Sequence, residues 1–214
     1  MSSDPGGPVD TLRSHWWWRP GWRYGRRCYT WLLTFARRPE LHRLVSRYQG
    51  AMFALEGFDL VPLEWLHLPL QDVGFTDEVT PDQATRVADA VTPRLAEVGP
   101  LTLTFHELRL TSEALVLPAR PLGALEPVRT AIREAVAEVL GADRVPAATE
   151  PVPQVSVAYA NAPANAVFAR AMLSGVDAPQ VEVPVTAASL VVLGRDHHMY
   201  EWQNLASAPL RTSV

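Results

Sequence analysis

The sequence is poor in cysteine, in long apolar runs and in net positive charge. Its one cysteine, Cys28, excludes an internal disulfide and fits a reducing cytoplasm. No uninterrupted apolar run reaches the roughly 20 residues of a membrane-spanning helix, and residues 1–10 lack the apolar core of a signal peptide. The net charge of −4 gives no bulk basic character of the kind that marks a large nucleic-acid surface. We therefore expect a cytoplasmic protein without a membrane partner.

Motifs for common cofactors and metal ions are also missing. No Gly-rich phosphate loop, nucleophile elbow or zinc-hydrolase motif occurs. The pair His197-His198 follows Asp196, but adjacent residues of a strand point to opposite faces and seldom bind one ion together. We interpret the pair as turn residues. The sequence predicts no cofactor and no metal site.

Two short stretches, far apart in the chain, carry the most information about function. Residues 63–74 and 153–161 both have β-forming residues at alternate positions and turn residues at their ends, which is typical of strands. Residues i and i+2 of a strand share a face. His67 and Pro69 should therefore point the same way, as should Gln154 and Ser156.

These stretches resemble the two H-x-T/S-x signatures of the two-histidine phosphoesterase superfamily, and in particular its 2'-5' RNA ligase-like members. Here the signatures read His67-Leu68-Pro69-Leu70 and Gln154-Val155-Ser156-Val157. The residues around them look like actinobacterial members of the family. The likeness continues into Tyr29-Thr30-Trp31 and Tyr200-Glu201-Trp202, so it covers nearly the whole chain.

The resemblance implies a bilobal, pseudo-duplicated α+β fold, with two antiparallel sheets flanking a central cleft and helices outside. Each lobe of such a fold supplies one strand that bears a signature. We expect residues 28–118 to form the first lobe and 119–214 the second, joined near Pro118–Pro121 into one compact domain. Residues 1–27 would form an N-terminal tail or lid.

Periodicity and turn residues predict the other elements. Helices are expected at 39–55, from residue 81 to about Pro93, at 122–140 and at 163–173. Strands are expected at 28–35, 101–110, 114–117, 181–193 and 199–205. Residues 101–117 should form a hairpin, and residues 142–152 a loop. Thr80 and Gln83 form a capping signature, and Pro93 should bend or end its helix.

The N-terminal residues allow two interpretations. Residues 16–27 hold four of the seven tryptophans and four arginines. They could form a lid that stacks on a planar ligand and attracts its phosphate. Alternatively, and in our preferred interpretation, they pack along the surface with the arginines in solvent. Residues 1–14 are expected to be a mobile tail, and His15 belongs to the same loose region. We expect His42 on a helix surface, whereas His106 could face either the cleft or solvent.

The resemblance also implies a site in which one histidine acts as base, the other as acid, and the hydroxyls hold phosphate oxygens. Two of these four positions differ here. Gln154 forms hydrogen bonds but does not titrate in the useful range, and Pro69 has neither a hydroxyl nor a backbone N–H. Losing one partner of an acid–base pair costs about 10²–10⁴ in rate. We expect His67 to be catalytic, with substrate contacts from residues around it: Gln154, Ser156, Pro69, Tyr159 and Trp31.

Three functions follow from these residues. The one we favour is a cleft redeployed for small-molecule biosynthesis, where His67 serves as general acid or base in a cyclisation, isomerisation or elimination. The second is weak 2',3'-cyclic or 2'-5' phosphodiesterase activity, with His67 or another histidine recruited. The third is a non-catalytic binding module with Gln154 and Ser156 as ligand contacts. In each case we expect a small, nucleotide-like ligand rather than RNA, and the sequence indicates no particular oligomeric state.

Overall fold

The computed structural model describes residues 9–53, 55–147 and 152–211. Residues 1–8, 54, 148–151 and 212–214 lie outside the described residues, and with them the start of the expected tail and part of the expected 142–152 loop. Within the described part, no helix is both long enough and apolar enough to cross a bilayer.

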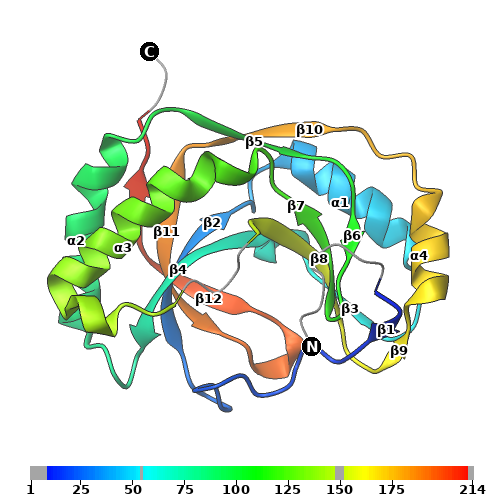
Figure 1. Cartoon of the computed structure of the whole chain (residues 1–214), viewed down its shortest axis with the longest axis horizontal. Helices are drawn as coiled ribbons and strands as arrows, with labels where there is room; N and C mark the ends of the chain where they lie inside the picture. The colour runs from blue at the N-terminus through cyan, green and yellow to red at the C-terminus, as the bar shows by residue number, and fades with distance from the viewer. Residues whose placement is uncertain (1–8, 54, 148–151, 212–214) are drawn as a thin grey trace.

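Two four-stranded antiparallel sheets form the body of the molecule (Figure 1). The first has the order β12-β11-β2-β4 and the second β3-β8-β7-β6. Their bounds are β12 Glu201–Pro209, β11 Ala187–Gly194, β2 Cys28–Thr34, β4 His67–Phe75, β3 Phe58–Leu60, β8 Gln154–Ala160, β7 Ala114–Pro118 and β6 Arg109–Leu110. Two further pairs join β10 (Val181–Val185) to β5 (Leu101–Phe105) and β1 (Thr11–Leu12) to β9 (Ala164–Asn165). The fold is α+β, as expected.

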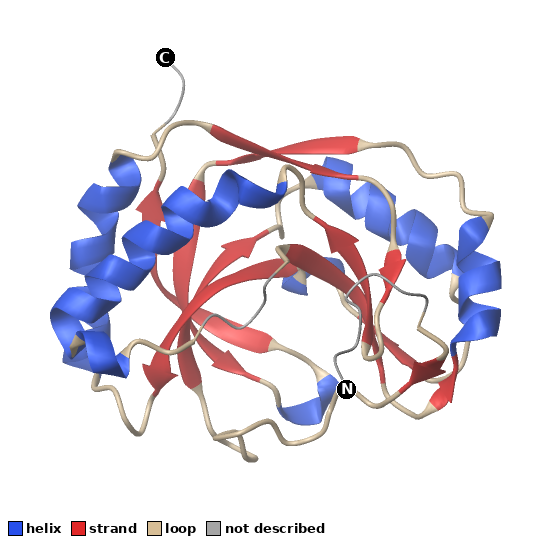
Figure 2. Ribbon diagram, in the orientation of Figure 1, coloured by secondary structure: helices blue, strands red, loops and turns tan. Residues whose placement is uncertain are grey.

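Helices lie on the outside of both sheets (Figure 2). Helices α2 (Pro81–Ala96) and α3 (Glu126–Leu140) pack on each other and on the first sheet through β12 and β4. Helix α1 (Pro39–Ala51) packs on β8 and β10, and also contacts α4 (Ala166–Ser174). The apolar stripes of α1, α2 and α3 are buried, because residues three and four apart share a helix face.

Local sequence explains where α2 begins but not where it ends. The Gln83 backbone N–H donates to Thr80 Oγ1 (3.2 Å) and the Thr80 N–H donates to Gln83 Oε1 (3.0 Å), which completes the expected capping box. The helix continues past Pro93 to Ala96, so of the two expectations for Pro93, a bend or an end, the end is wrong. Burial of Val91 and Leu95 on the core face stabilises this last turn.

The sheets interleave the two halves of the chain. The first sheet pairs β2 and β4 with β11 and β12, and in the second sheet β8 inserts between β3 and β7. Each sheet therefore takes strands from both expected lobes, residues 28–118 and 119–214. The reason lies in β2, which is buried almost along its whole length. Such a strand needs a neighbour on both edges, and β11 from the end of the chain supplies the second.

The expected hairpin over residues 101–117 also differs from the structure. Strand β5 leaves the expected hairpin and pairs with β10, while only the short strand β6 pairs with β7. The expected strand at 181–193 divides into β10 and β11 at residue 186. Tertiary pairing thus overrides the local hairpin pattern.

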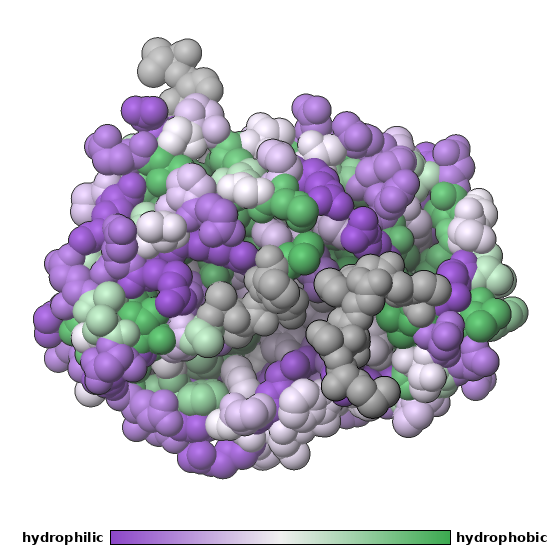
Figure 3. Space-filling model, in the orientation of Figure 1, coloured by the Kyte–Doolittle hydropathy of each residue, from purple (hydrophilic) through white to green (hydrophobic). Residues whose placement is uncertain are grey.

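The described residues of the expected mobile tail, 9–14, are held by hydrogen bonds to the rest of the molecule. Strand β1 pairs with β9, and the Arg13 N–H donates to the Ser112 carbonyl (2.8 Å). Residues 11–27, called the N-terminal segment below, then cross the lower edge of the molecule to reach β2 (Figure 1). On the face drawn in Figure 3, hydrophobic side chains lie scattered among hydrophilic ones, as on ordinary protein surfaces.

Candidate functional site

Strands β4 and β8 bring the residues of both signatures to one cavity. His67 and Gln154 are the first residues of the two strands, and Pro69 and Ser156 follow on the same faces. All four line a cavity of about 150 Å³. This volume is below the roughly 300–1,000 Å³ of a typical ligand pocket, so the cavity encloses a small group rather than a whole nucleotide.

A β-bulge adds a carboxyl group to the cavity. In the register of β2 and β4, Leu32 pairs with Pro69 but Trp31 pairs with Gln71, so Leu70 is an extra residue that inverts the alternation. Asp72 therefore returns to the cavity face. There Thr30 Oγ1 donates to Asp72 Oδ1 (2.8 Å), and burial raises the pKa of Asp72.

His67 is held as a neutral base. Its Nδ1 lies 2.9 Å from the Trp65 carbonyl, which can only accept, so Nδ1 carries the proton and Nε2 keeps its lone pair. The ring is 6 % exposed and packs edge-on against Tyr200 and Trp202, with centroids 5.7 and 5.2 Å away. Burial lowers the pKa of His67, against the opposing effect of the Trp65 hydrogen bond. At neutral pH the imidazole can therefore accept a proton at Nε2.

The other expected substrate contacts divide into two groups. Gln154, Ser156, Pro69 and Tyr159 line the cavity. Trp31 does not: it has no exposed surface and belongs to the main core. Thr30 and Leu32 of β2 face the cavity, so Trp31 between them points to the opposite face of the sheet.

The N-terminal segment contributes to the cavity, which the sequence analysis considered for residues 16–27 only as the alternative interpretation and did not consider for His15. His15, Arg19 and Trp22 line the cavity beside His67. His15 stacks on Tyr159 with ring centroids 4.3 Å apart, and its Nε2 lies 2.9 Å from the Tyr200 hydroxyl. Burial, then the positive charges of Arg19 and Arg195, then His67 lower the pKa of His15 to about 3. The prediction that His15 lies in a loose region is thus wrong, and its imidazole is neutral at physiological pH.

Buried polar contacts fix this segment in place. Glu113, in the turn before β7, accepts hydrogen bonds from Arg19 Nη2 (2.6 Å) and Trp17 Nε1 (3.0 Å). Arg195 Nη2 donates to the His15 carbonyl (3.0 Å). Glu113 and Arg195 are 7 % and 4 % exposed, so water does not compete freely for these contacts. No periodic pattern in the sequence signals such pairings across 94 to 180 residues.

The family model of the 2'-5' RNA ligase superfamily matches residues 37–197, which includes both strands of the site. The chain belongs to the 2'-5' RNA ligase superfamily. No curated protein has a significant sequence match to this superfamily member.

Solved structures share the fold of this superfamily member. The structure of TT0787 of Thermus thermophilus has a TM-score of 0.64 at 23% identity, covering 86% of this chain and 98% of that one. Escherichia coli LigT complexed with 3'-AMP has a TM-score of 0.62 at 15% identity, covering 87% and 99%. The MHV ns2 PDE domain has a TM-score of 0.54 at 16% identity, covering 78% and 99%.

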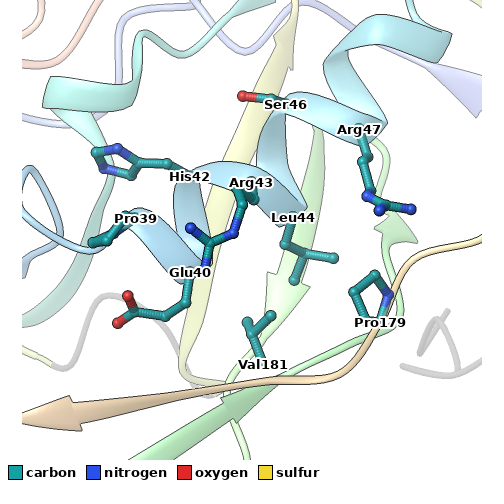
Figure 4. A pocket seen from close by; sticks show the side chains of 9 residues that line it. All are labelled: Pro39, Glu40, His42, Arg43, Leu44, Ser46, Arg47, Pro179 and Val181. Atoms are coloured by element: carbon teal, nitrogen blue, oxygen red, sulfur yellow. The ribbon is translucent and has the colours of Figure 1, made fainter.

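The remaining histidines of this superfamily member lie away from the cavity. His42 lies at a surface hollow of about 640 Å³ between α1 and β10 (Figure 4), with its Nε2 2.7 Å from the Phe35 carbonyl. His106 is exposed. His197 and His198 form a short 3-10 turn with Asp196, and His198 Nδ1 lies 3.5 Å from Asp59 Oδ2. In the part of the chain that the structure describes, no three potential ligands group as a metal site would need.

Proposed function

We propose that this protein is a small-molecule enzyme in which His67 is the one proton-transferring imidazole of the cavity. The reaction class is a cyclisation, isomerisation or elimination, each of which can proceed with a single base that later returns its proton. The observation that carries this proposal is the state of His67: Nδ1 is bound to its own chain, and Nε2 is left with a lone pair beside the cavity.

The neighbours of His67 support substrate binding rather than a second proton transfer. At the position of the other signature, Gln154 supplies an amide and Ser156 a hydroxyl, which can both donate and accept hydrogen bonds. His15 is nearby but neutral, and its Nε2 is engaged with Tyr200. Because a neutral imidazole with a pKa of about 3 is rarely protonated at pH 7, it is a poor general acid.

The first experiment compares His67→Ala with His106→Ala, a change at an exposed histidine away from the cavity. Each protein is incubated with extracts of small acidic metabolites, and substrate loss is followed by mass spectrometry. We expect turnover by the wild type and by His106→Ala, and a loss of about 10²–10⁴-fold in His67→Ala. Turnover that survives in folded His67→Ala would refute the role of His67.

A second candidate is a weak cyclic phosphodiesterase. It is favoured by family membership, by a second imidazole (His15) in the same cavity, and by the complex of the fold relative LigT with 3'-AMP. The test incubates high concentrations of the protein with 2',3'-cyclic nucleotides and 2'-5' dinucleotides. Product formation that requires both His67 and His15 would favour this candidate. The double change Gln154→His with Pro69→Thr should then raise cleavage, since it restores the family signature.

A further inference from the structure

Arg19 is the one permanently charged cation among the described residues that line the cavity. The two histidines of the lining, His15 and His67, both have lowered pKa values because they are buried, so neither brings positive charge at neutral pH. Attraction of an anionic ligand into this cavity therefore depends on a residue that lies outside both signatures.

The contacts of Arg19 neutralise only part of its positive charge and use only some of its N–H donors. Its Nη2 donates to Glu113 Oε2 (2.6 Å), while Arg13 Nη2 lies 2.7 Å from Glu113 Oε1. Two guanidinium groups thus share one carboxylate, and the pair of arginines keeps an excess of positive charge. A guanidinium has five N–H donors, and Arg19 remains 34% exposed. The ring of Trp17, 5.0 Å from Cζ, supports the guanidinium from one side.

We propose that Arg19 is the anion-binding residue of this cavity, and that the ligand group it binds is a phosphate facing His67. The N-terminal segment then supplies a ligand-binding residue to the site and does more than shield the cavity from solvent. This inference deepens the proposed function by naming the class of ligand, and it rests on that function only for the role of His67.

A phosphate fits the donors better than a carboxylate does. Arg19 approaches from the N-terminal segment, whereas the Ser156 hydroxyl and the Gln154 amide approach from β8. A tetrahedral anion accepts hydrogen bonds from several planes, but a carboxylate is flat. Asp72 is the acidic residue of the lining. Burial raises the pKa of Asp72, whereas the hydrogen bond from Thr30 Oγ1 lowers it and occupies Oδ1.

The test measures binding of inorganic phosphate, 3'-AMP, adenosine and acetate to the full chain by calorimetry. Arg19→Ala and Arg13→Ala form a matched pair, because both remove a partner of Glu113 but only Arg19 lines the cavity. We expect wild type and Arg13→Ala to bind phosphate and 3'-AMP equally. Arg19→Ala should bind both roughly 10- to 150-fold more weakly, the value of a hydrogen bond to a charged group. Arg19→Lys should retain part of the affinity.

Several results would overturn the inference. These are no phosphate binding by the wild type, equal weakening in Arg13→Ala and Arg19→Ala, or unchanged binding in Arg19→Ala. Acetate or adenosine binding as tightly as phosphate would overturn the ligand class. If Arg19→Ala does not fold, as judged by circular dichroism, Arg19→Lys and Arg19→Gln give the same comparison. Because phosphate binding by the wild type and by Arg19→Ala is measured without turnover, failure of the proposed catalytic role remains distinguishable from failure of this one.

Discussion

Burial of His15 predicts that the protein loses stability in mild acid. Burial and the neighbouring positive charges lower the pKa of the His15 imidazole to about 3 in the folded protein, from 6.5 for an exposed histidine. Below pH 6.5 the unfolded chain therefore binds a proton that the folded protein does not. Because stability rises with pH wherever the unfolded state holds more protons, this contribution is intact above pH 6.5 and is lost as the pH falls toward 3.

The size of the effect follows from the two pKa values. Between about pH 7 and about pH 5, the unfolded state gains about 2 kcal/mol from protonation of this one histidine, whereas the folded state gains almost nothing. That is a large part of a typical stability of about 5–15 kcal/mol. His67, whose pKa is lowered in the same direction, adds to the loss in the wild type and in any variant that keeps it.

The assay is urea unfolding of three proteins near pH 7 and near pH 5, followed by tryptophan fluorescence. His15→Gln keeps a hydrogen-bonding side chain beside Tyr200 but does not titrate. His106→Gln serves as the control, since it removes an exposed histidine. We expect wild type and His106→Gln to lose about 2 kcal/mol more than His15→Gln over this range. Equal losses in all three proteins would refute the buried, neutral state of His15.

Three further predictions concern the capping box of α2 and two buried side chains, Trp31 and Cys28. Thr80→Ala should lower the free energy of unfolding by about 1 kcal/mol through loss of the capping box, measured by urea unfolding, and Thr80→Ser should not. Trp31→Ala should cost about 3–5 kcal/mol, because this side chain is fully buried; a small change in the thermal midpoint would contradict its place in the core. Burial raises the pKa of Cys28 to about 12, so its thiol should react with a disulfide reagent near pH 8 only as fast as the protein unfolds. Immediate reaction in the native protein would contradict the buried position.

The sequence predicted the strands of the site because their information is local. Alternation in β4 and β8 placed His67 with Pro69 and Gln154 with Ser156, and these residues do line one cavity. The capping box of α2 and the buried stripes of three helices could also be predicted from the local sequence. Family resemblance, rather than periodicity, supplied the expectation that two strands far apart in the chain converge.

The residues that sequence reasoning missed depend on long-range contacts or on irregular backbone. Asp72 reaches the cavity only because a bulge at Leu70 inverts the alternation of β4. His15 and Arg19 reach it because Glu113 and Arg195 hold the N-terminal segment. No local pattern marks a buried ion pair of this kind, and an arginine-rich stretch is more often a solvated surface.

The central place of β2 in its sheet has a consequence for synthesis of the chain. β2 emerges early from the ribosome, yet its partner β11 is among the last strands made. At translation rates of about 5–20 residues per second, the intervening chain takes roughly 10 to 30 s to appear. Throughout that interval one edge of an apolar strand stays open, which invites pairing with other nascent chains. Slow, late closure of the sheet should make the yield of native protein sensitive to temperature and to chaperones during expression.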